Sequence, residues 1–428
     1  MRMRQGDKAG RAGWAGLFLL VATCASAQVS FDQAVGGLTS TDARVRLRSA
    51  TMLKESGYVE SAIPLARTIG DSDDAVQIES IAAELRIFVA GNVAPVKHLG
   101  IIVIEDRGRA DSQNAFDAGP LALGATRVPP AVIVALRSAT HDNSPKVALE
   151  ALYAFGALGA QLTGAARQDL LQTTASDLMA TLNLPDPALR LAAIRVIGRL
   201  YEKRAGDPPI DQRLSNLVIA AVNERDVPVK LAAMETLGLV RDTRAIDGLT
   251  QLFQFYGKGE LAEGALAALA RIGHRSSAQL FVMQLGSKSP AFKAMAVEGL
   301  ARTGDASHMA AIQGALKGER DVRVVAASEF AAAMLSNAPI EQVVDGLGRP
   351  KSHDMARQYL IELAPGKVRR MSRYAQDPNP RLRIDVADIA GMSGDAQGID
   401  VVAPLLADKD KQVALAAARA TLRLKSDR

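Results

Sequence analysis

The most constraining feature of the sequence is a unit of two amphipathic segments that recurs along the chain, most clearly in residues 226–257. Asp226 can cap a helix by accepting hydrogen bonds from backbone N–H groups, and Pro228 suits the first turn of that helix. Apolar and small residues follow from Val229 at helical spacing, and a second apolar stripe lies within residues 245–256. Such a helical hairpin has two apolar faces, which it can bury only by stacking on neighbours.

Residues equivalent to Val229, which we call anchors, recur at intervals that are mostly about 31 residues. The anchors are Val45, Val76, Val147, Leu189, Val229, Leu261, Phe292, Val324, Met355, Leu382 and Val413. Ala or Ser stands four residues after most anchors, which allows neighbouring helices to approach closely. A capping residue, most often Asp, stands three residues before most of them. We therefore expect an all-α fold, a right-handed α-solenoid of stacked helical hairpins.

Residues 186–193, 226–233 and 380–383 resemble HEAT repeats, and in particular the short HEAT-like repeats of the phycobilisome-lyase type. The resemblance covers nearly the whole chain after residue 27. It implies that the helix beginning at the capping residue lines the concave face. It also implies a ladder between units, in which a basic residue after the anchor pairs with the Asp. These basic residues are Arg46, Arg190, Lys230, Lys293 and Arg383. Where Ala, Val or Gln follows the anchor, we expect the ladder to be interrupted.

The first 27 residues have the pattern of a secretory signal peptide, with a basic start, a short apolar run at 14–23 and small residues at 25–27. The apolar run is shorter than the roughly 20 residues that a spanning helix needs. We expect cleavage after Ala27 and a periplasmic or secreted protein. Two alternatives are an uncleaved N-terminal anchor and a lipid anchor through Cys24, where residues 21–24 somewhat resemble a lipoprotein box.

Removal of residues 1–27 alters the charge balance. Lys and Arg fall from 51 to 47, and Asp and Glu fall from 46 to 45. The remaining net charge of +2 is not the excess typical of nucleic-acid binding. The only Cys is also removed, so the expected mature chain has no disulfide. We expect no nucleic-acid partner and no membrane span after signal cleavage.

The solenoid predicted for residues 28–428 contains one large irregularity, an insertion at about 91–130. The run 101–104 is apolar and suits a short buried strand or a plug, whereas Gly and Pro later in the segment do not favour a regular helix. Long insertions in repeat arrays often carry binding sites, but long surface loops also cost little closure entropy. Under either interpretation, a Gly-Ser linker in place of residues 113–124 should leave most of the fold intact.

The sequence contains no recognisable catalytic or ligand-binding motif. Its five histidines form no pair at metal-binding spacing, and His141 and His353 precede predicted helices, where polar residues act as caps. No nucleophile elbow and no phosphate-binding Gly-rich loop stands out. We therefore expect no catalytic, cofactor-binding or metal-binding residues, and no cofactor.

The position six residues after each anchor varies in character and should follow one ridge of the array. We select six of these residues as possible partner contacts: Tyr153, Arg195, Glu235, Glu298, Phe330 and Ile361. The apolar members could mark a contact with another protein. Alternatively, Tyr153, Phe330 and Ile361 pack against adjacent repeats, because large apolar residues are usually buried.

These patterns favour an exported, non-enzymatic scaffold that binds another protein or a peptide along an extended face of the solenoid. One alternative is an enzyme or enzyme subunit, lyase-like or metal-dependent, that uses the 91–130 insertion. Another is a structural spacer in an envelope assembly. The identity of the partner and the oligomeric state are left open by the sequence.

Overall fold

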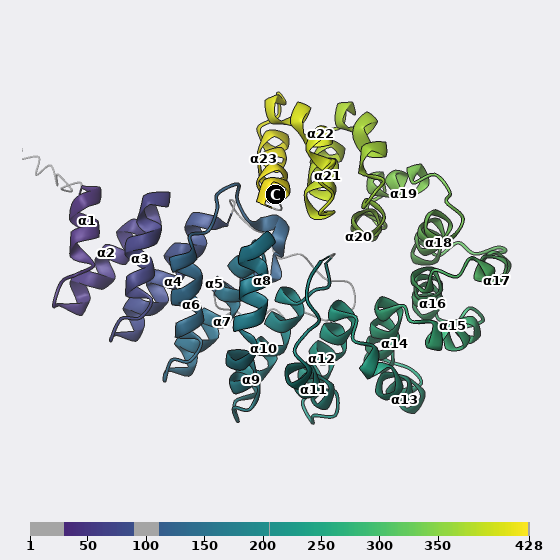
Figure 1. Ribbon diagram of the computed structural model, residues 1–428, viewed down its shortest axis with the longest axis horizontal. Helices are drawn as coiled ribbons and strands as arrows, with labels where there is room; N and C mark the ends of the chain where they lie inside the picture. The colour runs from purple at the N-terminus through teal and green to yellow at the C-terminus, as the bar shows by residue number, and fades with distance from the viewer. Residues whose placement is uncertain (1–29, 90–110, 205, 427–428) are drawn as a thin grey trace, which may run out of the picture.

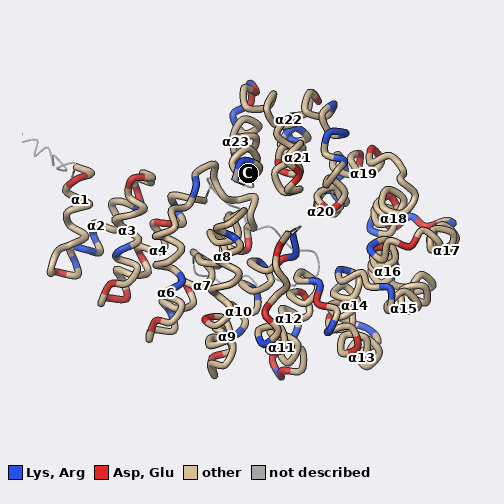
Figure 2. The backbone as a smooth tube through the Cα atoms, in the orientation of Figure 1, with Lys and Arg blue, Asp and Glu red and all other residues tan. Residues whose placement is uncertain are grey.

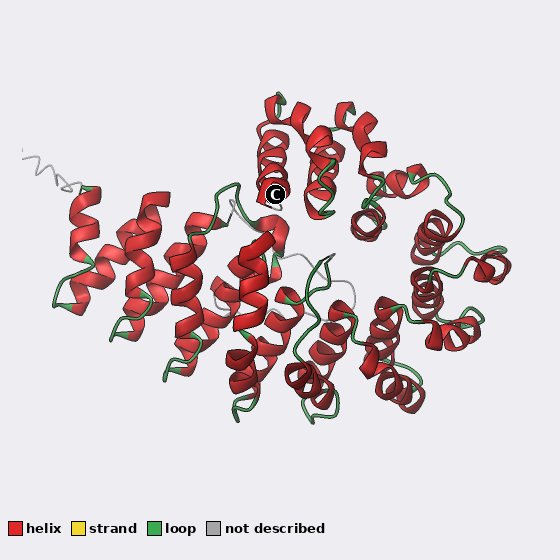
Figure 3. Ribbon diagram, viewed as in Figure 1, coloured by secondary structure: helices red, strands yellow, loops and turns green. Residues whose placement is uncertain are grey.

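The computed structural model describes residues 30–89, 111–204 and 206–426 as a curved array of helices (Figure 1). In these residues, helices and connecting loops account for the structure apart from one isolated β-bridge (Figure 3). The expected signal peptide at residues 1–27, Cys24 and the apolar run at 101–104 lie outside the described residues. In the part that is described, no helix combines the length and apolarity that a membrane crossing requires.

The helices form two rows, and the anchors lie on the inner one (Figure 1). The inner row is α2 (Ala43–Ser56), α4 (Asp74–Phe88), α7 (Pro145–Gly159), α10 (Pro187–Leu200), α12 (Val227–Val240), α14 (Glu260–Ile272), α16 (Pro290–Thr303), α18 (Val322–Leu335), α20 (His353–Leu363), α21 (Pro380–Met392) and α23 (Lys411–Ser426). Consecutive members of this row pack on one another. The helix that begins at the capping residue therefore lies on the concave side, as expected.

The outer row is made of shorter helices, several of them preceded or followed by a 3-10 turn. Its helices are α1 (Phe31–Gly37), α3 (Ala62–Thr68), α6 (Pro130–Ala139), α9 (Ala175–Leu182), α11 (Gln212–Ala221), α13 (Ile246–Tyr256), α15 (Ala278–Gln284), α17 (Met309–Ala315), α19 (Glu341–Asp345) and α22 (Gly398–Val402). The 3-10 segments are η1 (Val59–Ser61), η2 (Pro120–Ala122), η3 (Thr243–Ala245), η4 (Arg275–Ser277), η5 (Ala306–His308), η6 (Gly346–Gly348), η7 (Val368–Gln376) and η8 (Ala403–Ala407). Two further helices, α5 (Asp111–Asp117) and α8 (Gly164–Thr173), lie beside α7 and α9.

The inner helices begin and end where local chemistry predicts. Asp226 caps α12 by accepting from the Val229 N–H at 3.1 Å, whereas Ser144 occupies the same position before α7 without a side-chain bond. Gly273 ends α14 with a φ of 63°. A Cβ at Gly273 would overlap the Cβ of Arg302 on α16. Glycine is therefore required here for two reasons, the left-handed backbone conformation and the close approach of α16.

The core is continuous along the array, as stacking requires. One cluster of buried residues extends from Ala62 to Leu424, and a smaller one occupies the N-terminal end. Ala233 is fully buried, like its counterparts in the neighbouring units. The anchor Val45 differs because it is 43% exposed. It belongs to the first unit, which has a stacked repeat on one side only.

A ladder of ion pairs connects neighbouring units, but its acidic partner is not the capping Asp. Arg46 pairs with Asp71 at 2.7 Å, two residues before the capping Asp73. The other rungs of this kind are Arg190–Glu224, Lys293–Glu319 and Arg383–Asp408. In the Arg46, Lys293 and Arg383 rungs the acid also accepts from the capping residue's own N–H, as Asp71 does from Asp73 at 2.9 Å. The acidic partner therefore lies two residues before the capping residue that the resemblance implied. Lys230 forms no such rung with a described residue and donates to the Tyr256 hydroxyl.

One rung crosses the insertion. The Gln77 side chain donates to Asp142 with Nε2 and Oδ2 2.9 Å apart, although 65 residues separate them. The expectation that Gln interrupts the ladder was wrong here, because an amide N–H satisfies the carboxylate as a guanidinium would. The stacking therefore continues directly from α4 to α7.

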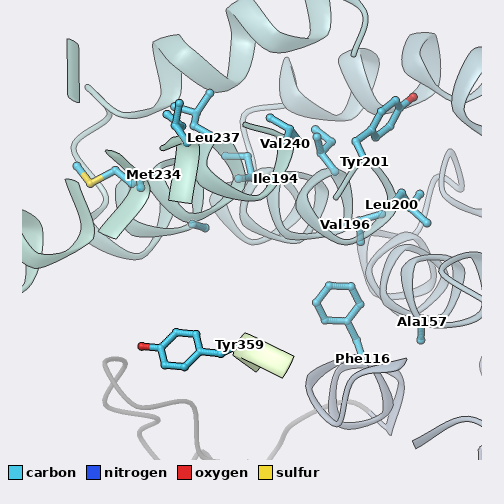
Figure 4. Packing of buried hydrophobic residues seen from close by; sticks show 14 of the residues in the cluster. Phe116, Ala157, Ile194, Val196, Leu200, Tyr201, Met234, Leu237, Val240 and Tyr359 are labelled. Atoms are coloured by element: carbon cyan, nitrogen blue, oxygen red, sulfur yellow. The ribbon is translucent and has the colours of Figure 1, made fainter. Parts of the chain in front are cut away.

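The described part of the insertion, residues 111–129, belongs to the core. Phe116 on α5 is 3% exposed and points toward Val196 of α10, and Leu123 is also buried (Figure 4). The Gly124 N–H donates to the Phe88 carbonyl at 2.6 Å, and Leu123 forms the isolated bridge with Val89. The expectation of a replaceable loop at 113–124 was wrong, because its apolar side chains fill the space beside α7.

The array curves until its last helix contacts this insertion (Figure 1). A guanidinium N–H of Arg423 on α23 donates to the Pro120 carbonyl, across 303 residues of sequence. The expected turn near residues 365–366 is present, with Gly366 at a φ of 73°, and η7 stands where an outer α-helix would follow. The inner row thus closes around a central space.

Candidate functional site: a central cavity on the inner row

A cavity of about 1800 Å³ lies inside the curve of the array. Its walls come from the C-terminal halves of inner helices α10 to α18, from α20, α21 and α23, from the α5–η2 segment and from the α7–α8 connection with the start of α8. We call it the central cavity and define it by its lining residues, which extend from Asp117 to Arg423. Acidic and basic residues occur together along the inner row (Figure 2). The cavity is therefore lined by charged side chains of both signs, with apolar residues between them.

One wall carries a buried ion-pair network around Arg302. Its Nε and Nη2 donate to the two carboxylate oxygens of Glu362 at 2.9 and 3.0 Å, and Nη1 donates to Glu298 at 2.9 Å. Burial lowers the pKa of the Arg302 guanidinium, but the charges of Glu362 and Glu298 outweigh it and hold that pKa above its ordinary value. Tyr359 completes the network by donating to Glu298 at 2.6 Å. The cluster is charged, hydrogen-bonded and rigidly packed.

Two further arginines approach this network from neighbouring units. Arg241 ends α12 with a φ of 55°, unusual for a residue with a Cβ, and its Nη2 lies 3.6 Å from Glu362. Burial lowers the pKa of Arg241; Glu362 opposes that effect, and the charges of Arg302 and Arg271 add to it. Arg271 pairs with Glu202 at 3.4 Å. This wall therefore brings together guanidinium groups from three units.

A second wall is built on Phe116. The guanidinium groups of Arg195 and Arg199 lie 5.1 and 4.7 Å from its ring centre, within the range of cation–π attraction. Arg195 also pairs with Asp117 at 2.5 Å. Burial lowers the pKa of Arg199, and the nearby charge of Arg195 lowers it further, whereas Glu202 opposes the change. The α5 segment thus holds two arginines of α10 in place.

We call the place where α23 meets the segment at Gly119 and Pro120 the seam. The seam contains more arginines. Arg419 pairs with Asp388 at 2.9 Å. Burial raises the pKa of the Asp388 carboxyl, and Arg419 opposes that shift. Burial lowers the pKa of Arg423 to about 10; Asp388 opposes that change, while the charges of Arg419 and Arg204 add to it. With a pKa of about 10, Arg423 still carries its charge at neutral pH.

Comparison with solved structures finds helical repeat proteins at low identity. An engineered protein is 18% identical, covering 92% of this chain and 98% of its own, with a TM-score of 0.46. A chain from the CpcE–CpcF complex of phycocyanin lyase from Nostoc sp. is 17% identical, covering 60% of this chain and 96% of its own, with a TM-score of 0.41. A chain from a study of cadherin and β-catenin is 12% identical, covering 92% and 94%, with a TM-score of 0.44.

No protein-family model matches the chain, and no curated protein matches it either. The assignment of the fold therefore depends on the chain's own two rows of helices and the ladder between its units. It is a HEAT-like helical solenoid. The solenoid's concave face is the surface that encloses the central cavity.

The six residues selected from the sequence fall into two groups in the solenoid. Glu235, Glu298 and Ile361 line the central cavity. Arg195 lies beside it, paired with Asp117.

The two aromatic members of the six are buried. Tyr153 is 2% exposed and packs on Phe116, with ring centres 5.4 Å apart. Phe330 is fully buried and stacks on Tyr359, with ring centres 4.5 Å apart. Their positions agree with the alternative in which large apolar residues at this register pack within the array.

Sequence reasoning missed the arginines that dominate the cavity. Four of them stand ten residues after an anchor: Arg199, Arg271, Arg302 and Arg423. This recurrence near the end of otherwise apolar helices is a signal that could have identified them. Among the described residues, no group of three or more His, Cys, Asp or Glu is placed to hold a metal ion.

Proposed function

We propose that this protein is a non-enzymatic scaffold that encloses a segment of another protein in its central cavity. The observation that carries the proposal is the size and composition of the cavity. Its volume of about 1800 Å³ exceeds the roughly 300–1,000 Å³ of small-molecule pockets. Its lining is mixed rather than mostly apolar, and it is contributed by many units, which suits an extended chain with side chains of several kinds.

Binding would be distributed over many inner helices. Met334 is 39% exposed and lines the cavity, and Ile361 lines it on α20. Such apolar positions can contact aliphatic parts of a bound segment, while the surrounding charged groups select its register. Because the arginines of the Arg302 network are already held by carboxylates, little side-chain entropy is lost there on binding.

A photo-crosslinking residue in place of Met334 tests this proposal, and Met283 provides the matched control. Met283 is 59% exposed on the outer helix α15 and does not line the cavity. Both substitutions replace an exposed methionine on a helix. They differ mainly in that position 334 probes the cavity and position 283 probes the outer surface. We expect illumination in the native cell extract to attach one discrete protein at position 334 and not at position 283.

The opposite pattern would overturn the proposal. Cross-links from position 283 alone would indicate that the partner binds the convex side of the solenoid and not the central cavity. A cross-linked product whose attachment maps to a second copy of this chain would make the cavity a self-association site.

We also infer export, from the signal-peptide pattern at residues 1–27. The expected mature protein begins at Gln28 and lacks Trp14 and Cys24. Intact-mass measurement of the protein recovered outside the cytoplasm tests this. A mass that shows a lipid on Cys24 would replace the soluble form with an anchored one.

A further inference from the structure

An arginine of the middle of the array and an arginine of its last helix converge on one short segment of the insertion. Nη1 of Arg199, on α10, lies 3.6 Å from the place where a Cβ on Gly119 would stand. Nη2 of Arg423, on α23, donates to the carbonyl of Pro120, the next residue. Both side chains line the central cavity. The closure of the array therefore brings both guanidinium groups to the Gly119–Pro120 segment.

Neither guanidinium forms an ion pair with a carboxylate in the part of the chain that the structure describes. Arg199 contacts the face of Phe116, and the nearest acids act on it only at a distance. Arg423 is 8% exposed and makes its hydrogen bonds to the Pro120 carbonyl and the Met392 sulfur. A buried cation paired only with neutral groups is costly, because desolvation is not offset by an opposite charge.

The other described charged groups at the seam do not pair with Arg199 or Arg423. Asp388 is already paired with Arg419. Arg204 donates to the carbonyls of Ala160 and Leu162 and adds a third guanidinium near Arg423. The seam therefore holds two guanidinium groups, those of Arg199 and Arg423, that have no paired carboxylate among the described residues, in contrast to the Arg302 network.

We propose that Arg199 and Arg423 form a carboxylate-binding site at the seam, which holds an acidic side chain of the bound protein segment. This inference rests on the proposed function, since it names the chemistry of the occupant of the same cavity. A guanidinium presents N–H groups in a planar fork that matches the two oxygens of a carboxylate. The negative charge of the bound side chain would also offset the cost of burying the two arginines. Binding would thus provide the carboxylate partner that Arg199 and Arg423 do not have among the described residues of the array.

The test is equilibrium binding of a fluorescein-labelled peptide of about ten glutamates to the full-length protein, followed by fluorescence anisotropy. A matching glutamine peptide reports binding that does not depend on carboxylates. We expect the glutamate peptide to bind more tightly and to weaken as salt rises, because charge attraction is screened.

Arg199→Gln is the primary variant, because the Arg199 guanidinium donates no hydrogen bond to a described residue and its loss should leave the fold intact. We expect about tenfold weaker binding of the glutamate peptide, as for the loss of one charge-assisted contact. Arg423→Gln should weaken it at least as much, and its melting curve shows whether the seam still closes. The matched control is Arg369→Gln, which removes an exposed arginine outside the cavity and should change binding less than twofold.

Equal affinity for wild type and Arg199→Gln, or equal losses in Arg199→Gln and Arg369→Gln, would overturn the carboxylate site. The two proposals can fail separately. Cross-links from position 334 with no effect of Arg199→Gln would leave a protein-binding cavity without this site. Arginine-dependent peptide binding without cross-links from position 334 would leave the anion site and reject the protein-segment scaffold.

Discussion

Arg302 and Glu362 form a two-pronged ion pair across 60 residues of sequence, with N–O distances of 2.9 and 3.0 Å. Their side chains are only 5% and 12% exposed. The pair joins α16 to α20 without passing through α18, whose Phe330 ring lies 5.2 Å from the guanidinium. Arg302 thus connects units that are not neighbours in the stack, on the wall of the central cavity.

Removing one partner of this pair should be strongly destabilising. Arg302→Met keeps much of the side-chain volume but leaves the largely buried Glu362 and the partly buried Glu298 with too little positive charge. We expect a loss of about 3–5 kcal/mol in the free energy of unfolding. The control Arg369→Met breaks an exposed pair with Asp400 and should cost less than about 0.5 kcal/mol. Urea denaturation of both variants measures the difference, and equal midpoints would show that the network contributes nothing.

Glu84 should make stability fall as pH rises. It stands eight residues after its anchor, where Leu53, Leu237 and Leu300 stand in other units, and neither of its carboxylate oxygens has a hydrogen-bond partner. Burial raises its pKa from 4.5 to about 9. In the folded chain the carboxyl is therefore neutral at pH 7, whereas in the unfolded chain it is ionised.

Since the folded pKa is the higher one, the stabilising contribution is complete below about pH 4.5 and is lost as pH rises toward about 9. The expected slope is about 1.4 kcal/mol per pH unit. Glu84→Gln should remove this slope when unfolding is compared between about pH 5 and pH 8. The exposed control Glu60→Gln should keep it. Parallel pH profiles for wild type and Glu84→Gln would contradict the burial of an unpartnered carboxyl.

Phe116 tests whether the insertion belongs to the core. Phe116→Ala removes a buried ring that touches Tyr153 and two arginines, so the cavity left behind should cost about 3–5 kcal/mol. Phe255→Ala is the matched control, because that ring is 81% exposed on α13 and its removal should cost little. Thermal melting compares them. Similar melting temperatures would restore the interpretation of residues 113–124 as a replaceable loop.

Ala233 tests the register of the repeat. It is fully buried at the fourth position after its anchor, so Ala233→Leu must displace a neighbouring helix. We expect a cost of about 1–3 kcal/mol from overpacking. Ala310→Leu places the same side chain at an exposed position of α17 and should leave the melting temperature nearly unchanged. A variant at position 233 that melts with wild type would mean that the helices do not approach closely there.

Much of the fold could be predicted because its signals are local. A cap such as Asp226 bonds to an N–H three residues away, and the apolar stripe from Val229 depends on the period of a single helix. The helical hairpins therefore followed from residues near each other in the chain, whereas the concave side was implied by the resemblance to HEAT-like repeats. The displaced ladder and the Gln77–Asp142 rung were missed, because several polar residues near each cap could have provided the partner.

The central cavity was decided by the tertiary structure alone. Its form depends on small rotations between successive units, which add up over the whole array and appear in no single repeat. Only the sum of these rotations brings Arg423 to Pro120 and encloses the central cavity. The sequence by itself determined that the helices form and stack. Where the stack curves back, and hence which arginines meet, was determined by packing across many units, because each rotation depends on side-chain contacts between neighbours rather than on a local pattern.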